Sequence, residues 1–156
     1  MIIRRAAPSD VDSLRRIHNA SIRRLCSAHY TPEQIHDWIR AIKPEGYLKA
    51  MEAYEFMLAV ETYIEGFCIL NTEKAQVTAL YVAPQSARKG IGRTLIREAE
   101  LLAGENGLCE LNLKATLNAV EFYERVGFLR REALSFLLPS GTGLMCISMT
   151  KSLDIG

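Results

Sequence analysis

The stretch that decides the fold is Leu80-Tyr81-Val82-Ala83-Pro84-Gln85-Ser86-Ala87-Arg88-Lys89-Gly90-Ile91-Gly92-Arg93. An apolar run typical of a strand leads through a proline and a basic turn to two glycines, and the periodic pattern of an amphipathic helix begins directly behind them. Free backbone N–H groups, a helix N-terminus and several cations then surround one small space, which suits a polyphosphate. We expect both glycines to let a ligand approach the backbone closely, because neither carries a Cβ.

The glycine turn does not complete either of the common nucleotide-binding motifs. A Walker loop would continue from its second glycine into Lys and then Ser or Thr, whereas Gly92 is followed by Arg93 and Thr94. A dinucleotide fingerprint would need a third glycine where Leu95 stands, and Glu110 alone lies near the distance expected of its acidic residue. The turn therefore indicates an anion site outside these two classes, or a plain tight connection between a strand and a helix.

The composition excludes several classes of function. The length of 156 residues fits one domain that spans residues 1–156 and buries a sizeable core. The net charge of +1 provides no general attraction to nucleic acid or to a membrane surface. No stretch approaches the roughly 20 apolar residues of a membrane span, and Met1 to Arg5 do not begin a signal peptide. We expect a cytoplasmic protein with neither nucleic acid nor membrane as its partner.

The cysteines provide no sign of a metal site. The chain has four, widely spaced and without the Cys or His spacing of metal ligands, so we expect reduced thiols and no metal. Three of them, Cys68, Cys109 and Cys146, lie in apolar, strand-like runs and are expected to be buried.

The remaining elements follow one another with short turns. The helix caps that we expect are Ser9, Thr31 and Asn118, each followed three residues later by a side chain that can complete a capping box. Gly107 and Gly127 are expected to end the last two helices. The expected strands are residues 2–5, 55–61, 66–71, 76–82, 108–113, 128–138 and 144–150. The order β-α-α-β-β-β-α-β-α-β-β indicates an α/β, mixed α+β domain.

A second segment indicates what the glycine turn is for. Residues 118–128 read Asn-Ala-Val-Glu-Phe-Tyr-Glu-Arg-Val-Gly-Phe, and together with residues 77–95 they resemble the GNAT-type N-acetyltransferase superfamily. The resemblance covers roughly residues 1–150 and implies a central, mostly antiparallel twisted sheet flanked by about four helices. It also implies acetyl-CoA as the co-substrate. The phrase from His29 to Trp38 looks like that of a subgroup of small, poorly characterised bacterial acetyltransferases.

The resemblance implies a role for each part of the two segments. The pantetheine arm of acetyl-CoA would lie like a short strand beside Leu80, Tyr81 and Val82, with the N–H of Val82 as the oxyanion donor. Asn118 would face the cofactor, and the hydroxyl of Tyr123 would protonate the departing thiolate. Either residue could instead be structural, Asn118 as a helix cap and Tyr123 as a core side chain. The backbone turn implied to hold the pyrophosphate consists of Arg88, Lys89, Gly90, Ile91, Gly92 and Arg93.

The sequence departs from the family pattern at two places. Ala87 stands where the turn commonly starts with Arg or Gln, so a side-chain contact to phosphate is lost or moved. Lys114 stands where some members carry a glutamate that acts as the general base. Where others have an acidic residue near the start of the earlier strand, this chain has Gln76 and Thr78. The general base is therefore unassigned. Glu61, Glu73 and His29 are candidates that would act through water, and an amine that arrives neutral would need none.

The segment from Cys26 to Trp38 is implied to line the acceptor side. His29 and Tyr30 are the candidate substrate-binding residues, whereas Trp38 has the helical spacing of a core residue. The resulting prediction is an acetyl-CoA-dependent N-acetyltransferase that acts on the primary amine of a small molecule, or of a peptide or protein, by direct attack. The alternative is an acyl-CoA sensor that binds the cofactor without catalysis. The apolar run from Leu144 to Met149 would permit a homodimer.

Overall fold

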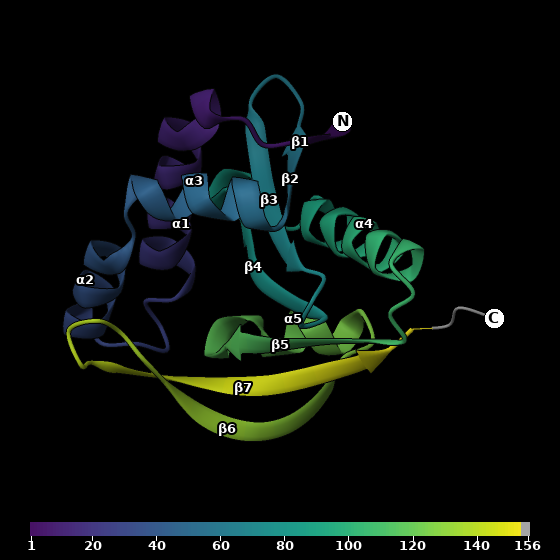
Figure 1. The fold of residues 1–156 in the computed structure, drawn as a ribbon. Helices are drawn as coiled ribbons and strands as arrows, with labels where there is room; N and C mark the ends of the chain where they lie inside the picture. The colour runs from purple at the N-terminus through teal and green to yellow at the C-terminus, as the bar shows by residue number, and fades with distance from the viewer. Residues whose placement is uncertain (154–156) are drawn as a thin grey trace.

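The computed structural model describes residues 1–153, which form one seven-stranded sheet with helices on both faces. Figure 1 shows the order of the elements. The strands are β1 (Ile2–Arg5), β2 (Glu55–Val60), β3 (Ile64–Asn71), β4 (Gln76–Val82), β5 (Glu110–Thr116), β6 (Leu129–Leu137) and β7 (Gly143–Ser152). The α-helices are α1 (Val11–Leu25), α2 (Pro32–Ala41), α3 (Pro44–Ala53), α4 (Ile91–Glu105) and α5 (Val120–Arg125). Three short 3-10 turns are η1 (Pro8–Asp10), η2 (Pro84–Ser86) and η3 (Leu117–Ala119).

The sheet is mostly antiparallel, as expected, and the exception lies at its centre. The strand order is β1-β2-β3-β4-β5-β7-β6, and every neighbouring pair is antiparallel except β4 and β5. The parallel pair is joined at only two positions, where Gln76 faces Asn112 and Val77 faces Leu113. Beyond Val77 the two strands diverge, so the C-terminal half of β4 has a neighbour on one side only.

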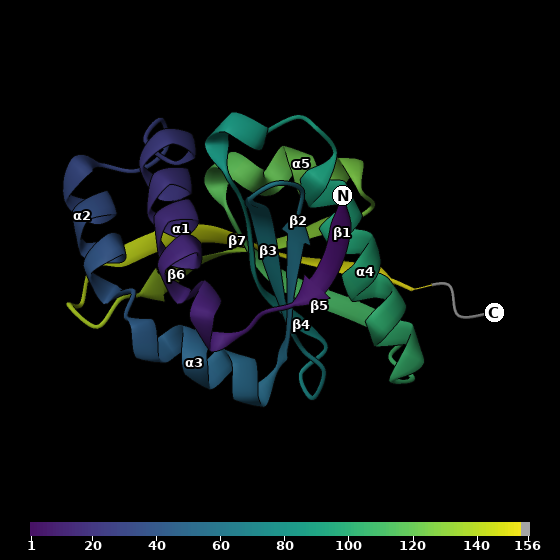
Figure 2. The ribbon, with the colours of Figure 1, turned by 90° about the horizontal axis from the view of Figure 1, so that it is seen from above.

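The two faces of the sheet are covered by different helices. Figure 2 shows α1, α2 and α3 on one side of β2, β3 and β4, and α4 on the other. The amphipathic stripe of α4 packs Leu95, Ile96 and Ala99 into a core that also receives α5. Leu14 and Ile17 of α1 pack with Phe67 on the opposite face. None of the helices within residues 1–153 has the length and apolar character that crossing a bilayer would require.

Several local predictions are confirmed. Thr31 caps α2: its Oγ1 accepts from the Gln34 backbone N–H at 3.1 Å, and Gln34 Oε1 accepts from the Thr31 N–H at 2.8 Å. Gly107 and Gly127 follow α4 and α5 with positive φ angles of +75° and +103°, which a glycine adopts without strain. Trp38 is buried, as its spacing predicted. These signals are local, so the sequence carries them completely.

Other predictions were wrong. The helix α3 was not expected, because only Tyr47 of its side chains is fully buried and the apolar periodicity is therefore weak. The strand expected over 108–113 begins later, at Glu110, and Cys109 before it is exposed rather than buried. The run considered for a homodimer, residues 144–149, lies in β7, which is paired on both sides, so the free edge at this end of the sheet is β6; the homodimer itself stays a prediction.

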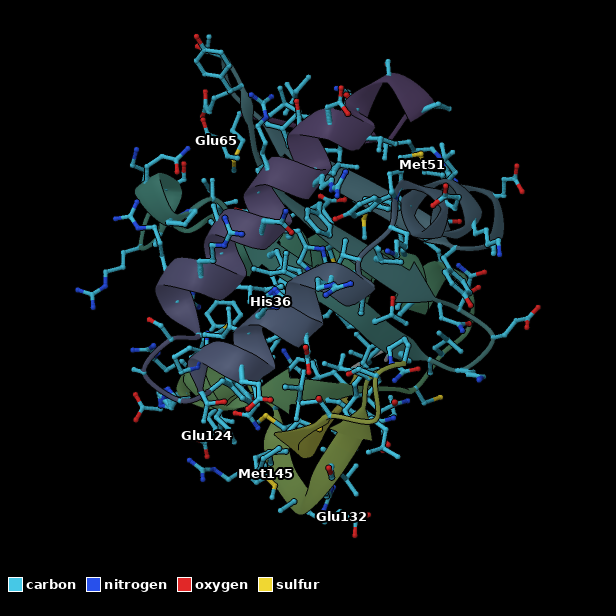
Figure 3. The ribbon with its side chains drawn as sticks, turned by 90° about the vertical axis from the view of Figure 1, so that its left-hand side faces the viewer. His36, Met51, Glu65, Glu124, Glu132 and Met145 are labelled. Carbon is cyan, nitrogen blue, oxygen red and sulfur yellow. The ribbon has the colours of Figure 1, made fainter. Side chains whose placement is uncertain are left out.

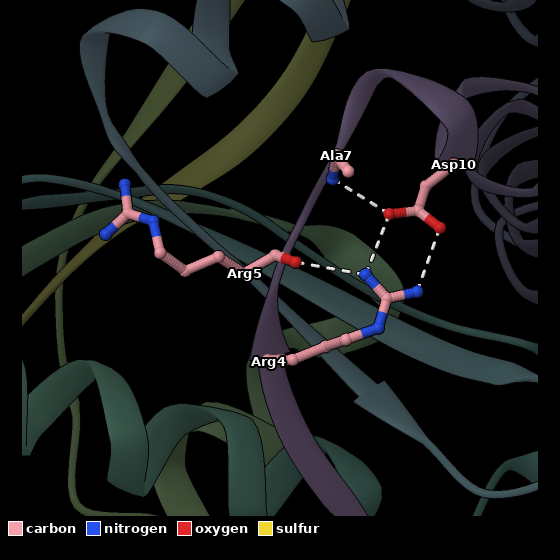
Figure 4. A network of polar contacts seen from close by, with 4 residues as sticks. All are labelled: Arg4, Arg5, Ala7 and Asp10. Carbon is pink, nitrogen blue, oxygen red and sulfur yellow. Dashed lines mark hydrogen bonds and ion pairs between the residues drawn. The ribbon is translucent and has the colours of Figure 1, made fainter.

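The cap expected at Ser9 is also wrong. Asp10 takes its place and connects β1 to α1. The carboxylate of Asp10 accepts from the Ala7 backbone N–H at 2.8 Å and from both terminal nitrogens of Arg4 at 2.9 Å (Figure 4). The hydrogen bonds from Arg4 lower the pKa of Asp10 below its ordinary value. The Asp10 side chain does not bond to an N–H group of α1; it fixes the turn before the helix through Ala7 and Arg4, and its charged, bidentate contact is stronger than one to a serine hydroxyl.

Replacing Asp10 by Asn tests this contact. We expect the free energy of unfolding at pH 7 to fall by about 1–2 kcal/mol, the range for a charged hydrogen bond at a helix start. Because the folded-state pKa of Asp10 is lowered, its contribution is present above the unfolded-state pKa and disappears as the pH falls through the folded-state value. Urea titrations of both proteins at pH 7 and at acid pH should therefore show a difference in unfolding free energy that is smaller at acid pH. Asp12→Asn, on the exposed side of α1, is the control.

Candidate active site

The divergence of β4 and β5 leaves main-chain groups of β4 without a strand partner. The Ala83 N–H donates to the Glu65 carbonyl at 2.8 Å, and Tyr81 lies opposite Phe67 in the same antiparallel ladder. Because main-chain groups alternate in direction along a strand, those of Leu80 and Val82 point away from β3 and toward β5. The closed end of the gap is tied by Asn112, whose N–H and side-chain amide both donate to the Ala75 carbonyl.

The gap ends at the glycine turn, which exposes a series of backbone donors. The first hydrogen bond of α4 runs from the Thr94 N–H to the Gly90 carbonyl, and no side chain caps the helix. Within residues 1–153, no N–H group from position 88 to position 93 donates to another main-chain group. The side chains of Arg88, Lys89 and Arg93 are exposed around these donors. The start of α4 thus has the free donors and positive charge that bind an anion.

The two glycines of the turn serve different purposes. Gly90 has a φ angle of +81°, a left-handed conformation that favours glycine, and a Cβ there would meet nothing within 4 Å. A Cβ on Gly92 would lie 3.1 Å from the ring of Phe122. The missing Cβ of Gly92 therefore also lets α5 pack closely against α4, and the contact of Gly92 with a ligand stays a prediction.

Tyr123 lies on α5 beside this gap. Its ring is buried, with edge contacts to Phe122 and Phe128 at centroid distances of 5.2 and 5.7 Å. It belongs to the same core as Leu80 and Val82. Burial raises the pKa of Tyr123 above its ordinary value, so the phenol keeps its proton at neutral pH. Among the described residues, the hydroxyl has no hydrogen-bond partner.

Asn118 is not the helix cap that the sequence suggested. It lies within η3, and α5 begins after it without a side-chain cap. Its Oδ1 atom is buried and has no hydrogen-bond partner within the described part of the chain. Leaving a buried acceptor unpaired costs about 1–3 kcal/mol, so this oxygen is the kind of group that a ligand N–H satisfies.

Asn118 shares a small hollow with His29. The hollow has a volume of about 280 Å³ and brings the loop after α1 beside η3, α5 and the two last strands. Glu121 and Arg130 contribute its other polar side chains. A larger hollow of about 490 Å³ lies outside the gap, between α1, the β2–β3 turn and η2. Arg4 and Asp10 in its lining neutralise each other, and Arg16 is a further cation in it.

Tyr30, the second residue expected on the acceptor side, is bound to the protein itself. Its hydroxyl donates to the Met145 carbonyl at 2.6 Å and accepts from the Leu117 N–H at 3.0 Å. Its ring packs edge-on against Trp38 at 5.5 Å. Figure 3 looks at this face, with α1 and α2 in front of the strands and Met145 labelled below them. Tyr30 therefore joins the loop after α1 to β7 and η3, with both hydrogen-bonding capacities of its hydroxyl used.

The structure separates the three candidates for the general base. Glu61 pairs with the N-terminal amino group at 3.2 Å in the β2–β3 turn, and Glu73 is exposed in the β3–β4 turn beyond the closed end of the gap. His29 alone lies in the hollow with Asn118. Lys114, which replaces the family glutamate, extends toward the Phe136 ring, with its Nζ 5.8 Å from the centroid.

His18 is the titratable residue near β4 that the sequence did not single out. Its Nδ1 is 2.8 Å from the Tyr47 hydroxyl, and its ring centroid is 4.1 Å from that of Tyr81. Burial lowers the pKa of His18 to about 3, so the imidazole is neutral at physiological pH. The sequence alone does not single out His18, because its partners come from α3 and β4 and meet it only in the fold.

Comparison with known proteins agrees with this geometry. Residues 26–152 match a family model described as an acetyltransferase (GNAT) domain. Spermidine N(1)-acetyltransferase of Thermoplasma acidophilum is 28% identical over 143 residues, covering 81% of this chain and 86% of that protein. A GCN5-related N-acetyltransferase from Rhodopseudomonas palustris superimposes with a TM-score of 0.91 at 28% identity, over 97% of this chain and 95% of that chain. PaiA N-acetyltransferase from Thermoplasma acidophilum, in complex with coenzyme A, superimposes with a TM-score of 0.81 at 24% identity, over 97% of this chain and 98% of that chain.

Replacing Tyr30 by Phe tests the link between the α1–α2 loop and β7. The variant keeps the ring but leaves the Leu117 N–H and the Met145 carbonyl without their partner. We expect the free energy of unfolding to fall by about 1–3 kcal/mol, measured by urea denaturation. The control is Tyr63→Phe, whose side chain is 76% exposed and should change stability little. Equal stability of the two variants would contradict the bridging role.

Proposed function

The chain belongs to the acetyltransferase (GNAT) domain family, and we propose on that basis that it transfers the acetyl group of acetyl-CoA to the primary amine of a small molecule. The observation that carries the proposal is the unpaired edge of β4, which ends at the uncapped start of α4. An extended chain with amide groups and a polyphosphate at one end fits that combination. A plain structural turn would not need an open strand edge beside it.

The residues present fit acetyl-CoA. The main-chain groups of Leu80 and the carbonyl of Val82 would pair with the pantetheine amides, in the manner of an added strand, which leaves the Val82 N–H for the thioester oxygen. The free N–H groups between Arg88 and Arg93 would hold the pyrophosphate. The buried Oδ1 of Asn118 would accept from an N–H of the cofactor, which relieves its unpaired state. PaiA, which has the same fold, binds coenzyme A in its crystal structure.

The chemistry follows from the groups on either side of the gap. The Val82 N–H would donate to the thioester oxygen as it becomes negative while the amine nitrogen attacks the carbonyl carbon and the C–S bond breaks. Tyr123 would donate its proton to the departing thiolate, and the proton that the amine releases would match the one that Tyr123 then takes up again. The raised pKa of Tyr123 keeps it protonated for this step. Because Glu61 is paired with the N-terminal amino group and Glu73 is exposed in the β3–β4 turn, the amine would lose its proton to water or to His29, or would arrive neutral.

The transfer reaction is tested by measuring free thiol released from acetyl-CoA in the presence of a panel of primary amines. An acyl-CoA sensor would show a melting temperature raised by acetyl-CoA and no thiol release with any amine. An acetyltransferase shows both effects. This assay therefore decides between the two functions that the sequence left open.

Replacing Tyr123 by Phe removes the proposed proton donor and keeps the ring. We expect kcat to fall about 100-fold, the low end for the loss of a general acid, with the melting shift caused by acetyl-CoA unchanged. The comparison is Tyr63→Phe, at the exposed turn between β2 and β3. A Tyr123→Phe enzyme with the turnover of the unmodified protein would assign Tyr123 to the core alone.

Replacing Asn118 by Ala separates cofactor binding from stability. The free protein should lose little stability, because the Oδ1 of Asn118 has no partner to lose. The rise in melting temperature caused by acetyl-CoA should shrink, since one hydrogen bond to the bound cofactor is missing; we expect about a tenfold weaker Kd, or about 1.4 kcal/mol. Asn106→Ala, at the exposed end of α4, is the control. An undiminished melting shift would remove Asn118 from the cofactor site.

A further inference from the structure

The side chains on the α1 side of β4 form an aromatic group next to the gap. His18, Tyr47, Phe67 and Tyr81, here called the uncharged cluster, come from α1, α3, β3 and β4. The ring of Tyr81 is 4.1 Å from His18 and 5.6 Å from Phe67, and His18 is 5.7 Å from Phe67. Tyr47 and Phe67 are buried, whereas His18 and Tyr81 are partly exposed and form the open edge of the cluster.

With the pantetheine beside Leu80 and Val82, as proposed above, the thioester would end next to the cluster. Tyr81 stands between Leu80 and Val82, whose side chains belong to the opposite core under α4 and α5. Because side chains alternate along a strand, Tyr81 points to the α1 side while its neighbours' main-chain groups face the gap. The α4 side next to the gap is filled by packed side chains that include Tyr123. An acceptor on the α1 side would approach the thioester across from that proton donor.

The cluster has no charge at neutral pH. Burial lowers the pKa of His18 to about 3 and raises the pKa of both Tyr47 and Tyr81 above their ordinary values. The groups that further raise the pKa of Tyr81 are other tyrosines and Cys26, and the charged side chain acting on Tyr47 is Arg15, a cation. Within residues 1–153, no carboxylate contributes to the pKa shifts of these three residues.

An uncharged aromatic wall suits some amines and not others. Each ammonium group taken out of water costs several kcal/mol unless a carboxylate pairs with it. Contact with an aromatic ring recovers about 0.5–2 kcal/mol, which does not offset that cost for the several ammonium groups of a polyamine. A monoamine with an aromatic or apolar body has one ammonium group, whose proton it must lose in any case to react. Burial of the rest of the molecule is favourable.

His18 adds one hydrogen-bonding group to the wall. Its Nδ1 is engaged with Tyr47, but its Nε2 is buried without a partner among the described residues. An unpaired buried nitrogen is unfavourable by about 1–3 kcal/mol, which a polar atom of a bound molecule would recover.

From this arrangement, and resting on the acetyl transfer proposed above, we infer that the acceptor is a monoamine with an aromatic or apolar body, which binds against His18 and Tyr81. The chemistry of the wall separates this acceptor from a polyamine. The spermidine acetyltransferase that this chain resembles would then differ from it in acceptor class.

The first experiment compares two acceptors on the unmodified protein. Thiol release is measured with 2-phenylethylamine and with spermidine at pH 8.5, and the ratio of their kcat/KM values is taken. We expect 2-phenylethylamine to be preferred at least about tenfold, which corresponds to about 1.4 kcal/mol. A preference for spermidine overturns the inference and leaves acetyl transfer standing. If neither these two nor any other amine of the panel releases thiol, the proposed function fails and the inference falls with it.

The second experiment introduces the missing charge. His18→Glu and His18→Gln have nearly the same shape and differ by one negative charge, and at pH 8.5 the carboxyl is ionised unless its pKa rises by about 4 units. We expect the Glu variant to shift the kcat/KM ratio toward spermidine about tenfold relative to the Gln variant. The ratio does not depend on the fraction of folded protein, so general instability cannot produce the shift. The same ratio in both variants would show that the acceptor does not bind beside His18.

Discussion

The divergence of β4 from β5 after Val77 is the constraint on which the rest of the structure depends. Two parallel pairings and the side chain of Asn112 hold the strands together at one end, and beyond them no hydrogen bonds join the strands. Backbone groups that face such a gap must find a partner, since unpaired main-chain groups are costly when they are shielded from water. The turn before α4 and the short helix α5 are placed around this gap, so their groups act on whatever fills it.

The two sides of the gap have different chemistry. On the α4 and α5 side, the phenol of Tyr123 is protonated at neutral pH. Asn118 presents a buried oxygen that has no hydrogen-bond partner among the described residues. On the α1 side, His18 and Tyr81 form an aromatic edge without charge. The first set suits a donor with amides and a leaving thiolate, and the second suits an acceptor with an apolar body. The two sets lie on opposite faces of β4 and meet at the gap, where Tyr123 acts on the pKa of Tyr81.

The predictions that succeeded and failed differ in the range of the interactions involved. The capping box of Thr31 and Gln34 was predictable, because both partners lie within one turn of helix. Ser9 and Asn118 had the same local pattern and cap nothing: Asp10 replaces Ser9 through Arg4 of β1, and Asn118 lies in η3. In both cases a residue distant in sequence, or an added turn of helix, overrode the local signal. The packing of Phe122 against Gly92 was equally invisible in the sequence, because α5 is distant from the glycine turn along the chain.

The sequence by itself determined the donor side of this protein: the strand, glycine turn and helix, and the Tyr123 segment, are contiguous motifs whose spacing is sufficient to recognise the family. Only the tertiary structure decided the side that we propose for the acceptor. It brought His18 of α1, Tyr47 of α3 and Tyr81 of β4 together, and it bound the hydroxyl of Tyr30 to the main chain. The physical reason is that a phosphate turn is made by consecutive backbone groups, whereas an acceptor wall is made by side chains from separate elements that meet only after the sheet and helices have packed.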